Sequence, residues 1–338
     1  MLGAIVFLLV LGFSLTWYLW EKHHRQTRPM SGGLHLEITL PHQHEYELYH
    51  NGLSLCSKKV RVCLKELQIP FAEHHIDLVE TGSYEVLSRH FLKVNPAGLL
   101  PVLVHKGHPI YESHDIITYC AEQAATDAAV LLPLDNNERT EMNIWMDRAS
   151  MKGEDPAQGL SDSAANCVAV LTLPLFCSAM QEIPYRKLFD GLLFHRIKFR
   201  PVLFFLLKLR GLGGLSGVPP LVQEVAKAYE AMGSHLDALE AQLAAGLWIC
   251  GCQFTLADVS WMVIFERLFE ADWIDSLVTP KRRPQVHAYW LRLQQRPSYA
   301  GISEYRLPIV DRATERIRAY KKIHEGFSEA LTMSSQEK

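Results

Sequence analysis

The sequence predicts an α/β domain followed by an all-helical domain, with one apolar helix in front of both. Three observations support this prediction. Residues 1–20 contain no charged side chain, strand and helix patterns alternate over residues 45–125, and only helix patterns follow over residues 135–325. The chain has 338 residues, of which 48% are hydrophobic, so it is long enough for about two domains with substantial cores.

The first twenty residues, MLGAIVFLLVLGFSLTWYLW, predict one transmembrane helix that serves as an anchor. Twenty helical residues rise about 30 Å, which matches the hydrocarbon core of a bilayer. Trp17, Tyr18 and Trp20 then lie where aromatic side chains gather at the membrane surface. A cleaved signal peptide is the alternative, but the segment lacks a basic start and the small residues of a cleavage site.

The charges after this segment predict its orientation. Lys22, Arg25 and Arg28 lie on its C-terminal side, so the positive-inside rule places the folded part in the cytosol. The seven cysteines agree with a reducing compartment, because their number is odd and their spacing is uneven. We expect residues 21–44, which are polar and include Pro29, to form a linker.

Charge and cysteine spacing exclude two classes of function. The net charge is −3 with neutral histidines, so the chain lacks the basic field of a nucleic-acid-binding protein. Cys250 and Cys252 are too close together for two ordinary zinc ligands, and no CxxC pair occurs. We therefore expect neither a nucleic-acid partner nor a metal site.

Residues 45–125 carry the pattern of a thioredoxin-like domain. The predicted order is strand, helix, strand, helix, two strands joined at Lys106-Gly107, and a last helix. A βαβ unit followed by a ββα unit gives a mixed sheet with helices on both faces. Such a domain also has a cis proline at the start of its third strand, and Pro101 in NPAGLLPVLV takes this place.

Ser54 and Cys56 lie where the first strand pattern changes into a helix pattern. The free N–H groups and the positive dipole end of that helix stabilise an anion or a thiolate above the turn. Because Lys58 and Lys59 follow, we expect the pKa of the Cys56 thiol to lie below its ordinary value. A half-buried structural thiol is the alternative for Cys56.

Residues 135–325 predict a helical domain with an insertion at about residues 155–217. The insertion mixes Leu and Phe with basic residues, and its apolar runs are too short to span a bilayer. In the stretch LFDGLLFHRIKFRPVLFFLLKLRGLGGL these basic residues are His195, Arg196, Lys198, Arg200, Lys208 and Arg210. It either lies on the anionic cytosolic face of a membrane or packs over the domain junction. In FTLADVSW, the spacing of Thr255 and Asp258 predicts a capping box, and therefore a structural Asp258.

Four stretches, SLCSKKVR, NPAGLLPVLV, YESHDII and FTLADVS, together resemble the cytosolic glutathione transferase superfamily over about residues 45–310. SLCSKKVR is similar to the helix start of the zeta class and of tetrachlorohydroquinone dehalogenase. The SKKVR run, WICGCQFTLADVS and the anchor also resemble the ganglioside-induced differentiation-associated proteins, although those carry their anchor at the C-terminal end. The resemblance implies that the helical domain is the glutathione transferase C-terminal domain.

The resemblance implies two catalytic residues at the start of the first helix. Ser54 matches the serine that donates a hydrogen bond to the glutathione sulfur and holds it as thiolate. Cys56 matches the cysteine that forms a mixed disulfide with glutathione in the zeta and dehalogenase enzymes. The chain departs from the zeta class at Leu55, where those enzymes have a second serine.

The resemblance also implies the residues that bind the glutathione backbone. Leu100, directly before Pro101, matches the backbone clamp for the cysteinyl unit. Glu112 and Ser113 match the pair that holds the γ-glutamyl end. Asp115 departs from the pattern, because the family usually places a small residue there.

The implied function is a membrane-tethered glutathione transferase, dimeric as the family usually is. Glutathione is the expected co-substrate, and its thiolate would attack a hydrophobic small-molecule electrophile. Isomerisation and reductive dehalogenation are variants of this reaction. Two alternatives are a non-catalytic scaffold at a membrane and a thiol transferase that works through Cys56.

Overall fold

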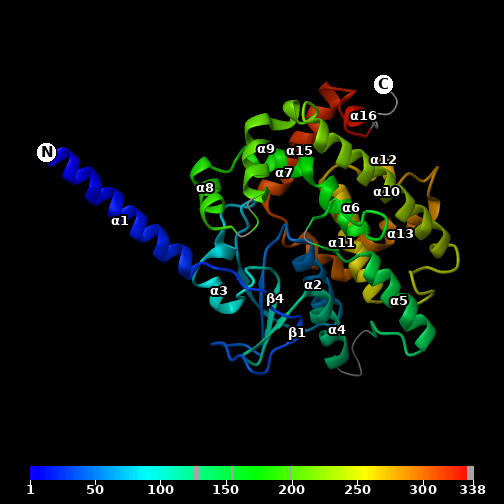
Figure 1. The fold of residues 1–338 in the computed structure, drawn as a ribbon. Coiled ribbons are helices and arrows are strands. Elements are labelled where there is room, and N and C mark those ends of the chain that lie inside the picture. Colours follow the sequence, from blue (N-terminus) through cyan, green and yellow to red (C-terminus); the bar gives the residue numbers. More distant parts are fainter. Residues whose placement is uncertain (125–129, 154, 196, 198, 333–338) are drawn as a thin grey trace.

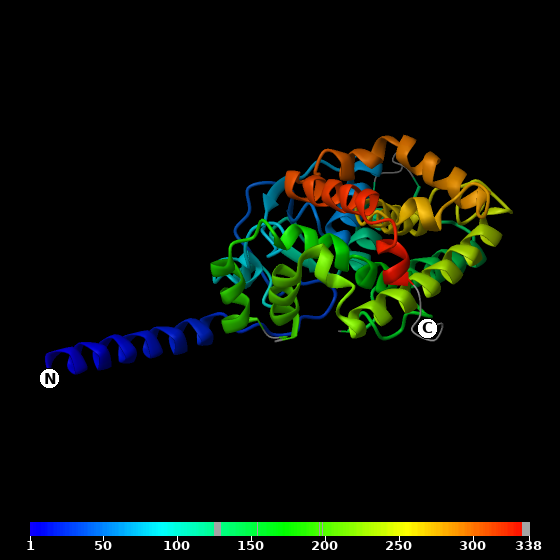
Figure 2. The same cartoon turned by 90° about the horizontal axis from the view of Figure 1, so that it is seen from above.

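The computed structural model describes residues 1–124, 130–153, 155–195, 197 and 199–332 (Figure 1). It contains a five-stranded sheet with its helices, a helical domain beside the sheet, and helix α1, which extends away from both. Figure 2, turned by 90° from Figure 1, also shows α1 extending away from the folded part. Two basic residues of the predicted insertion, Arg196 and Lys198, lie outside the described residues.

The sheet has the strand order β1-β5-β4-β2-β3. The strands are β1 (Gly33–Leu34), β2 (Tyr46–His50), β3 (Ala72–His75), β4 (Val102–His105) and β5 (His108–Tyr111). Strands β2 and β3 are parallel, and the remaining neighbours are antiparallel. The helices of this domain are α2 (Leu55–Glu66), η1 (Glu85–Leu87), α3 (Phe91–Val94) and α4 (Ser113–Gln123). This arrangement confirms the predicted thioredoxin-like domain.

Helix α2 is buried on more than its apolar side. Val60 and Cys63 are fully buried, as their helical spacing predicts. Lys58 and Arg61, which lie on the other face of the helix, are fully buried as well. The helical domain covers this side, and Arg61 Nε donates a hydrogen bond to the Gly301 carbonyl oxygen at 2.8 Å.

Within the described residues, the second domain consists of helices, apart from two isolated β-bridges at residues 248–253. The first five are α5 (Asn136–Arg148), α6 (Ala164–Leu171), α7 (Leu173–Met180), α8 (Tyr185–Phe194) and α9 (Phe199–Leu215). They are followed by α10 (Pro219–Leu243), α11 (Leu256–Glu270), α12 (Ile274–Leu277), α13 (Pro284–Gln295), η2 (Pro297–Tyr299), α14 (Ala300–Ser303), α15 (Pro308–Ile323) and α16 (Phe327–Thr332). Helix α11 forms the centre of the core, because nearly all of its side chains are buried.

The capping box at the start of α11 is present as predicted. An Asp258 carboxylate oxygen accepts a hydrogen bond from the Thr255 backbone N–H at 2.8 Å. The same carboxylate accepts hydrogen bonds from the Ile249 N–H at 3.0 Å and the Tyr289 hydroxyl at 2.8 Å. Asp258 is fully buried, and its role is structural.

The predicted insertion, residues 155–217, does not form one unit. Helices α6 and α7 are almost wholly buried in the bundle, and only α8 and α9 lie at its side (Figure 1). Arg200 of α9 donates a hydrogen bond to the buried Glu80 carboxylate at 2.8 Å, and Gly191 of α8 packs against the Tyr84 ring. Helices α8 and α9 therefore pack over the domain junction, which is one of the two predicted alternatives.

The prediction of a linker at residues 21–44 is wrong. The first four of these residues continue α1, and the next ones follow the surface of the thioredoxin-like domain. Arg28 donates its backbone N–H to the Pro96 carbonyl oxygen at 2.9 Å, and β1 extends the sheet beyond β5. A two-residue edge strand uses only backbone hydrogen bonds, and Gly33–Leu34 is too short to show a strand pattern.

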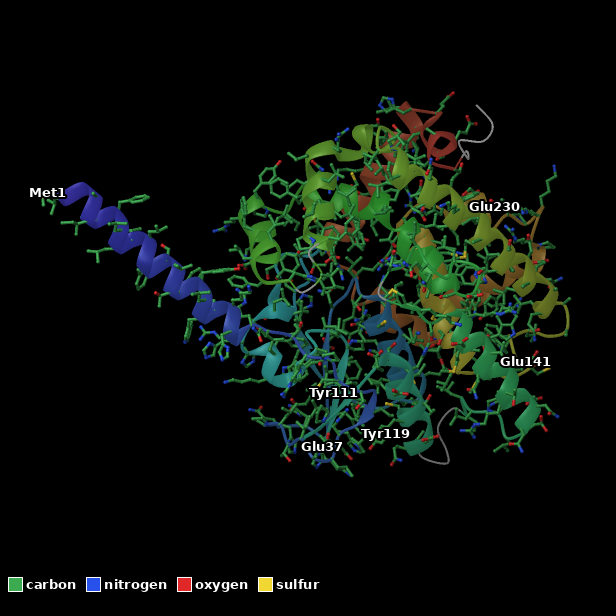
Figure 3. All side chains as sticks on the ribbon, viewed as in Figure 1. Met1, Glu37, Tyr111, Tyr119, Glu141 and Glu230 are labelled. Carbon is green, nitrogen blue, oxygen red and sulfur yellow. The ribbon has the colours of Figure 1, made fainter. Side chains whose placement is uncertain are left out.

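Helix α1 (Leu2–His24) is long and apolar enough to cross a membrane, a property that N-terminal signal sequences share. Its most apolar window has a mean hydropathy of 2.1 and is 0% buried. Figure 3 shows the side chains of α1 standing clear of the folded part, with Met1 at the far end. Helices α9 and α10 pass the same test only together, and they are bent by 73° at their junction.

Candidate functional site

The residues predicted for the site meet at one end of the sheet. Strand β4 pairs with β2 on one side and with β5 on the other. Continuing both registers by two residues or fewer places Pro101 between His50 of β2 and Glu112, which follows β5. Ser54 and Cys56 follow β2 after a short turn, so they start α2 at the same end of the sheet.

The peptide bond between Leu100 and Pro101 is cis, as predicted. Asn95 fixes the loop before it, because its side-chain amide donates to the Leu99 carbonyl oxygen at 2.8 Å and its side-chain oxygen accepts from the Ala97 N–H at 2.9 Å. The backbone groups of Leu100 therefore occupy a defined position beside the turn from β2 into α2.

Ser54 is the N-cap residue of α2. Its hydroxyl oxygen accepts a hydrogen bond from the Ser57 backbone N–H at 3.2 Å. A hydroxyl that accepts in this way still carries a proton that it can donate. Ser54 can therefore cap the helix and at the same time donate to an anion in front of the helix N-terminus.

Lys59 is a buried cation beside the predicted site residues Cys56 and Glu112. Its side chain is almost fully buried, and Nζ contacts His114 Nε2 at 2.6 Å. Burial lowers the pKa of Lys59 from 10.5 to about 8, against the opposing effect of the Cys56 and Glu112 charges. Both groups therefore lie within electrostatic reach of the Lys59 ammonium group.

His114 joins Lys59 to the helical domain. Burial, followed by the charge of Lys59, lowers the pKa of His114 to about 2, so its ring is neutral. Because an ammonium group can only donate, Nε2 accepts from Lys59 and the ring proton is on Nδ1. Nδ1 then donates to the Ser150 hydroxyl oxygen, which donates to the Met146 carbonyl oxygen at 3.3 Å. No sequence pattern predicts a role for His114 and Ser150, because their proximity depends on how the two domains pack.

Lys58 does not lie in the site, contrary to the expectation that it acts on Cys56. It is fully buried and paired with Glu270 of α11. Burial opposes ionisation of Glu270, but Lys58 and Arg267 outweigh it and hold the pKa of this carboxyl below its ordinary value. Arg267 donates to Glu270 at 2.9 Å and also to the carbonyl oxygen of Leu53. This ion-pair network attaches the helical domain to the residue that precedes Ser54.

Glu112 has an unusual backbone conformation, with φ at 63° and ψ at 123°. Positive φ is uncommon for a residue with a Cβ atom, and such strain is concentrated at functional sites, where the surrounding structure maintains it. The next residue, Ser113, is the first residue of α4 and is buried. Glu112 and Ser113 therefore form the N-terminal end of α4, next to Pro101.

Residues 25–34, here called the strap, run along the edge of the site. Thr27 packs against Gly98 in the loop before Pro101. Further along, Gly32 lies so close to the Asp115 carboxylate and the Glu112 side chain that a Cβ atom at Gly32 would collide with Asp115. The strap therefore contacts the loop and the helix start that flank Pro101. Asp115, the departure from the family pattern, lies against the strap.

Two family models match the chain. The glutathione S-transferase N-terminal domain matches residues 53–123, and the glutathione S-transferase C-terminal domain matches residues 222–289. The chain is therefore similar to both domains of a glutathione S-transferase. The N-terminal match contains all six predicted site residues, and the C-terminal match contains α11 with its capping box.

Relatives along most of the chain agree with these matches. Glutathione S-transferase TCHQD of Arabidopsis thaliana is 25% identical over 76% of this chain and 88% of its own length. Tetrachloro-P-hydroquinone reductive dehalogenase of Sphingobium chlorophenolicum is 21% identical over 75% of this chain and 94% of its own length. These relatives identify the chain as an enzyme of the glutathione S-transferase type.

Solved structures share the fold. The beta-etherase LigF from Sphingobium sp. strain SYK-6 has a TM-score of 0.63 and 20% identity, covering 78% of this chain and all of LigF. This likeness confirms a glutathione S-transferase fold with a thioredoxin-like first domain and a helical second domain. The roles of Ser54, Cys56, Leu100, Glu112 and Ser113, the membrane anchor and the dimer stay predictions.

Proposed function

We propose that this protein is a membrane-tethered glutathione transferase that acts on hydrophobic electrophiles. The observation that carries the proposal is the convergence at one end of the sheet. Ser54 offers a free hydroxyl proton at a helix N-terminus, beside Leu100-Pro101 and Glu112-Ser113. A tripeptide thiol that lies across this end would meet a donor for its sulfur, backbone groups for its centre and a helix start for its γ-glutamyl carboxylate.

In the proposed reaction, the protein positions glutathione and stabilises its thiolate. The Ser54 hydroxyl donates a hydrogen bond to the sulfur, and the N-terminus of α2 adds its positive dipole end. The sulfur lone pair then forms the bond to the electrophilic carbon while the electrophile's leaving group departs with its electron pair. Relatives of this chain include a reductive dehalogenase, which supports halogenated aromatic compounds as one class of electrophile.

Thiol transfer through Cys56 is a second candidate, because Lys59 lies within electrostatic reach of Cys56. A cationic neighbour favours the thiolate form of a cysteine. The Cys56 thiolate would attack the disulfide of a glutathione mixed disulfide and release the other sulfur as a thiolate. A second glutathione thiolate would then regenerate Cys56 and leave as glutathione disulfide.

The membrane tether is supported by α1, whose side chains over residues 2–17 are all exposed. We propose that α1 crosses the membrane once, with the catalytic domain in the cytosol, and that the enzyme forms the homodimer usual in its family. Extraction of membranes with alkaline carbonate tests the anchor. The full chain should stay in the membrane with its N-terminus intact, and a soluble product beginning near residue 30 would contradict the anchor.

Retention on immobilised glutathione, followed by turnover of a generic electrophile, tests the enzymatic function. The full chain in neutral detergent should be retained, elute with free glutathione and conjugate 1-chloro-2,4-dinitrobenzene. Retention without turnover would favour the Cys56 reaction if thiol transfer is observed. Loss of retention, conjugation and thiol transfer together would favour the scaffold. Light scattering of the same sample measures the oligomeric state.

A further inference from the structure

An open pocket of about 530 Å³ lies where α1 joins the folded part. We call it the root pocket. Its lining residues are Glu21, Arg25, Ser88, Arg89, His90 and Lys93. Glu21 lies in the last turn of α1, and Arg25 directly follows that helix. Of the other four, three lie in the turn between η1 and α3, and Lys93 lies in α3. The root pocket shares no residue with the predicted glutathione site.

The end of α1 is fixed to the thioredoxin-like domain at this pocket. Arg25 Nε donates to the Leu87 carbonyl oxygen at 2.8 Å, and the Arg25 guanidinium lies 4.1 Å from the centre of the Phe194 ring. On the other side of the helix end, the Arg89 guanidinium lies 4.4 Å from the Trp20 ring. The root pocket therefore has a defined position relative to the apolar part of α1.

That position corresponds to the headgroup layer of a bilayer. The apolar sequence of α1 ends at Trp20, and Glu21 and Arg25 lie within about one and a half turns of it. Trp and Tyr side chains concentrate at the boundary between hydrocarbon and headgroups. If α1 spans the bilayer as proposed, the root pocket opens at the depth of the lipid phosphates.

The root pocket contains more positive than negative charge. Arg25, Arg89 and Lys93 are cations, and Glu21 is the single carboxylate among the lining residues that the structure describes. Glu21 lies 3.5 Å from Arg89, and Asp190 lies 3.7 Å from Arg25. Both distances exceed the roughly 2.7–2.9 Å of a charge-assisted hydrogen bond, so these acids leave donor capacity on both guanidinium groups.

We propose that the root pocket binds the phosphate group of an anionic phospholipid from the cytosolic leaflet. The site rests on the proposed membrane insertion of α1, which sets its depth. The guanidinium groups of Arg25 and Arg89 can each donate two parallel hydrogen bonds to a phosphate diester, and the Lys93 ammonium group adds a third positive charge. Basic pockets beside a membrane helix on its cytosolic side are suited to anionic headgroups.

An exposed apolar stripe on α8 lies beside the root pocket and is consistent with a lipid partner. Tyr185, Phe189 and Leu193 follow one another at four-residue intervals, and 43%, 51% and 40% of their surfaces are exposed. Phe194, at the end of the same helix, contacts Tyr18 of α1 with ring centres 6.0 Å apart. Figure 1 shows α8 on the side from which α1 leaves the molecule. The stripe and the pocket would thus meet the same membrane surface.

The test measures binding of fluorescent phosphatidylserine to the full chain in neutral detergent micelles, with fluorescent phosphatidylcholine as the neutral probe. We expect the chain to bind phosphatidylserine more tightly than phosphatidylcholine. The double variant Arg89→Gln, Lys93→Gln should bind phosphatidylserine about thirtyfold more weakly, since each basic residue near a membrane surface contributes about a factor of five. Both side chains are exposed, so the fold should tolerate the change.

A second double variant, Lys281→Gln with Lys322→Gln, is the matched control, because it removes the same charge from exposed positions outside the root pocket. It should bind phosphatidylserine as the parent does. Equal weakening in both double variants, or equal binding of the two lipids by the parent, would overturn the site. Full competition by millimolar inorganic phosphate would overturn the lipid assignment and indicate a soluble phosphate ligand.

This experiment is separable from the proposed function. Micelles present the lipid whether or not α1 spans a membrane in the cell, and the binding signal does not need turnover. If the chain loses carbonate resistance but still prefers phosphatidylserine, the tether is rejected and the lipid site stands. If the chain does not conjugate but still prefers phosphatidylserine, the enzymatic function is rejected and the lipid site stands. Normal conjugation without lipid selectivity would reject the pocket alone.

Discussion

Lys59 Nζ lies 2.6 Å from His114 Nε2, and this contact joins helices α2 and α4 next to the predicted thiol chemistry. The neutral imidazole accepts the hydrogen bond but brings no negative charge. The described hydrogen-bond partners of Lys59 Nζ are His114 and the Ala149 carbonyl oxygen. None of these described partners is a carboxylate that would neutralise the ammonium group. Its charge remains available to a thiolate at Cys56.

Removing the Lys59 charge should slow the reaction of Cys56. For Lys59→Met we expect alkylation of Cys56 by iodoacetamide at pH 7 to fall about three- to tenfold, because one nearby buried charge contributes roughly 1 kcal/mol. Peptide mapping by mass spectrometry measures Cys56 separately from the exposed Cys252. Lys65→Met, which removes a half-buried lysine from the same helix, is the control and should leave the rate unchanged. Equal rates in both variants would contradict the role of Lys59.

The same lysine should make stability depend on pH in the alkaline range. Its pKa is about 8 in the folded chain and 10.5 as the ordinary value, so between these pH values only the unfolded chain binds the proton. The free energy of unfolding should therefore rise with pH across this window, by about 3 kcal/mol in total. Urea unfolding at pH 7.5 and pH 10 measures the rise, and Lys59→Met should lack this part of it.

Ser54 and Cys56 should have separable roles. Ser54→Ala removes a hydrogen bond to a charged sulfur, worth roughly 1.5–3 kcal/mol, so conjugation should fall about ten- to a hundredfold while glutathione affinity changes little. Cys56→Ser should leave conjugation nearly intact and abolish thiol transfer. Conjugation rate, thiol-transfer rate and glutathione affinity are measured for both variants.

A control for Ser54→Ala is needed, because this serine also caps α2 and its loss should cost about 1 kcal/mol of stability. Asp135→Ala removes the N-cap of α5, far along the chain from Ser54, and should lower stability without lowering conjugation. If Ser54→Ala conjugates at the parent rate while Cys56→Ser loses every activity, the serine assignment is wrong and the cysteine reaction replaces it.

Glu270 should be essential for stability. Glu270→Gln leaves the buried Lys58 and Arg267 without a counter-charge, so the free energy of unfolding should fall by roughly 3–5 kcal/mol. Tryptophan fluorescence during urea unfolding measures this change. Glu304→Gln, which removes the exposed partner of Lys65, should cost less than about 1 kcal/mol. Similar losses in the two variants would show that the buried network contributes nothing special.

Displacing the strap should be possible with a single methyl group. In Gly32→Ala the new Cβ atom meets the Asp115 carboxylate, which is the exposed end of a side chain and must turn away, so the strap should loosen and β1 should lose part of its protection from hydrogen exchange. Combining it with Asp115→Ala makes room for the methyl group and should restore protection. Gly326→Ala, at a position with open space around it, is the control. Unchanged exchange in Gly32→Ala would mean that the strap yields without detaching.

The local patterns that predict this fold act over a few residues. The helical spacing of Val60 and Cys63, the cis proline at Pro101 and the capping box of Thr255 and Asp258 depend on neighbours in sequence, and all three are present. The strap had no such signal. It is held to the thioredoxin-like domain by backbone hydrogen bonds and by the Arg25 and Thr27 side chains, and all of these contacts are with residues distant in sequence.

The sequence by itself determined the two domains, the apolar first helix and the end of the sheet where Ser54 and Glu112 meet, because periodicity, turns and capping are short-range effects. Only the tertiary structure decided which lysine serves that site. Lys58 and Lys59 are adjacent in sequence, but successive residues of a helix point about 100° apart. Helix α11 therefore pairs with Lys58 through Glu270, whereas Lys59 lies against His114 with its charge free for the site.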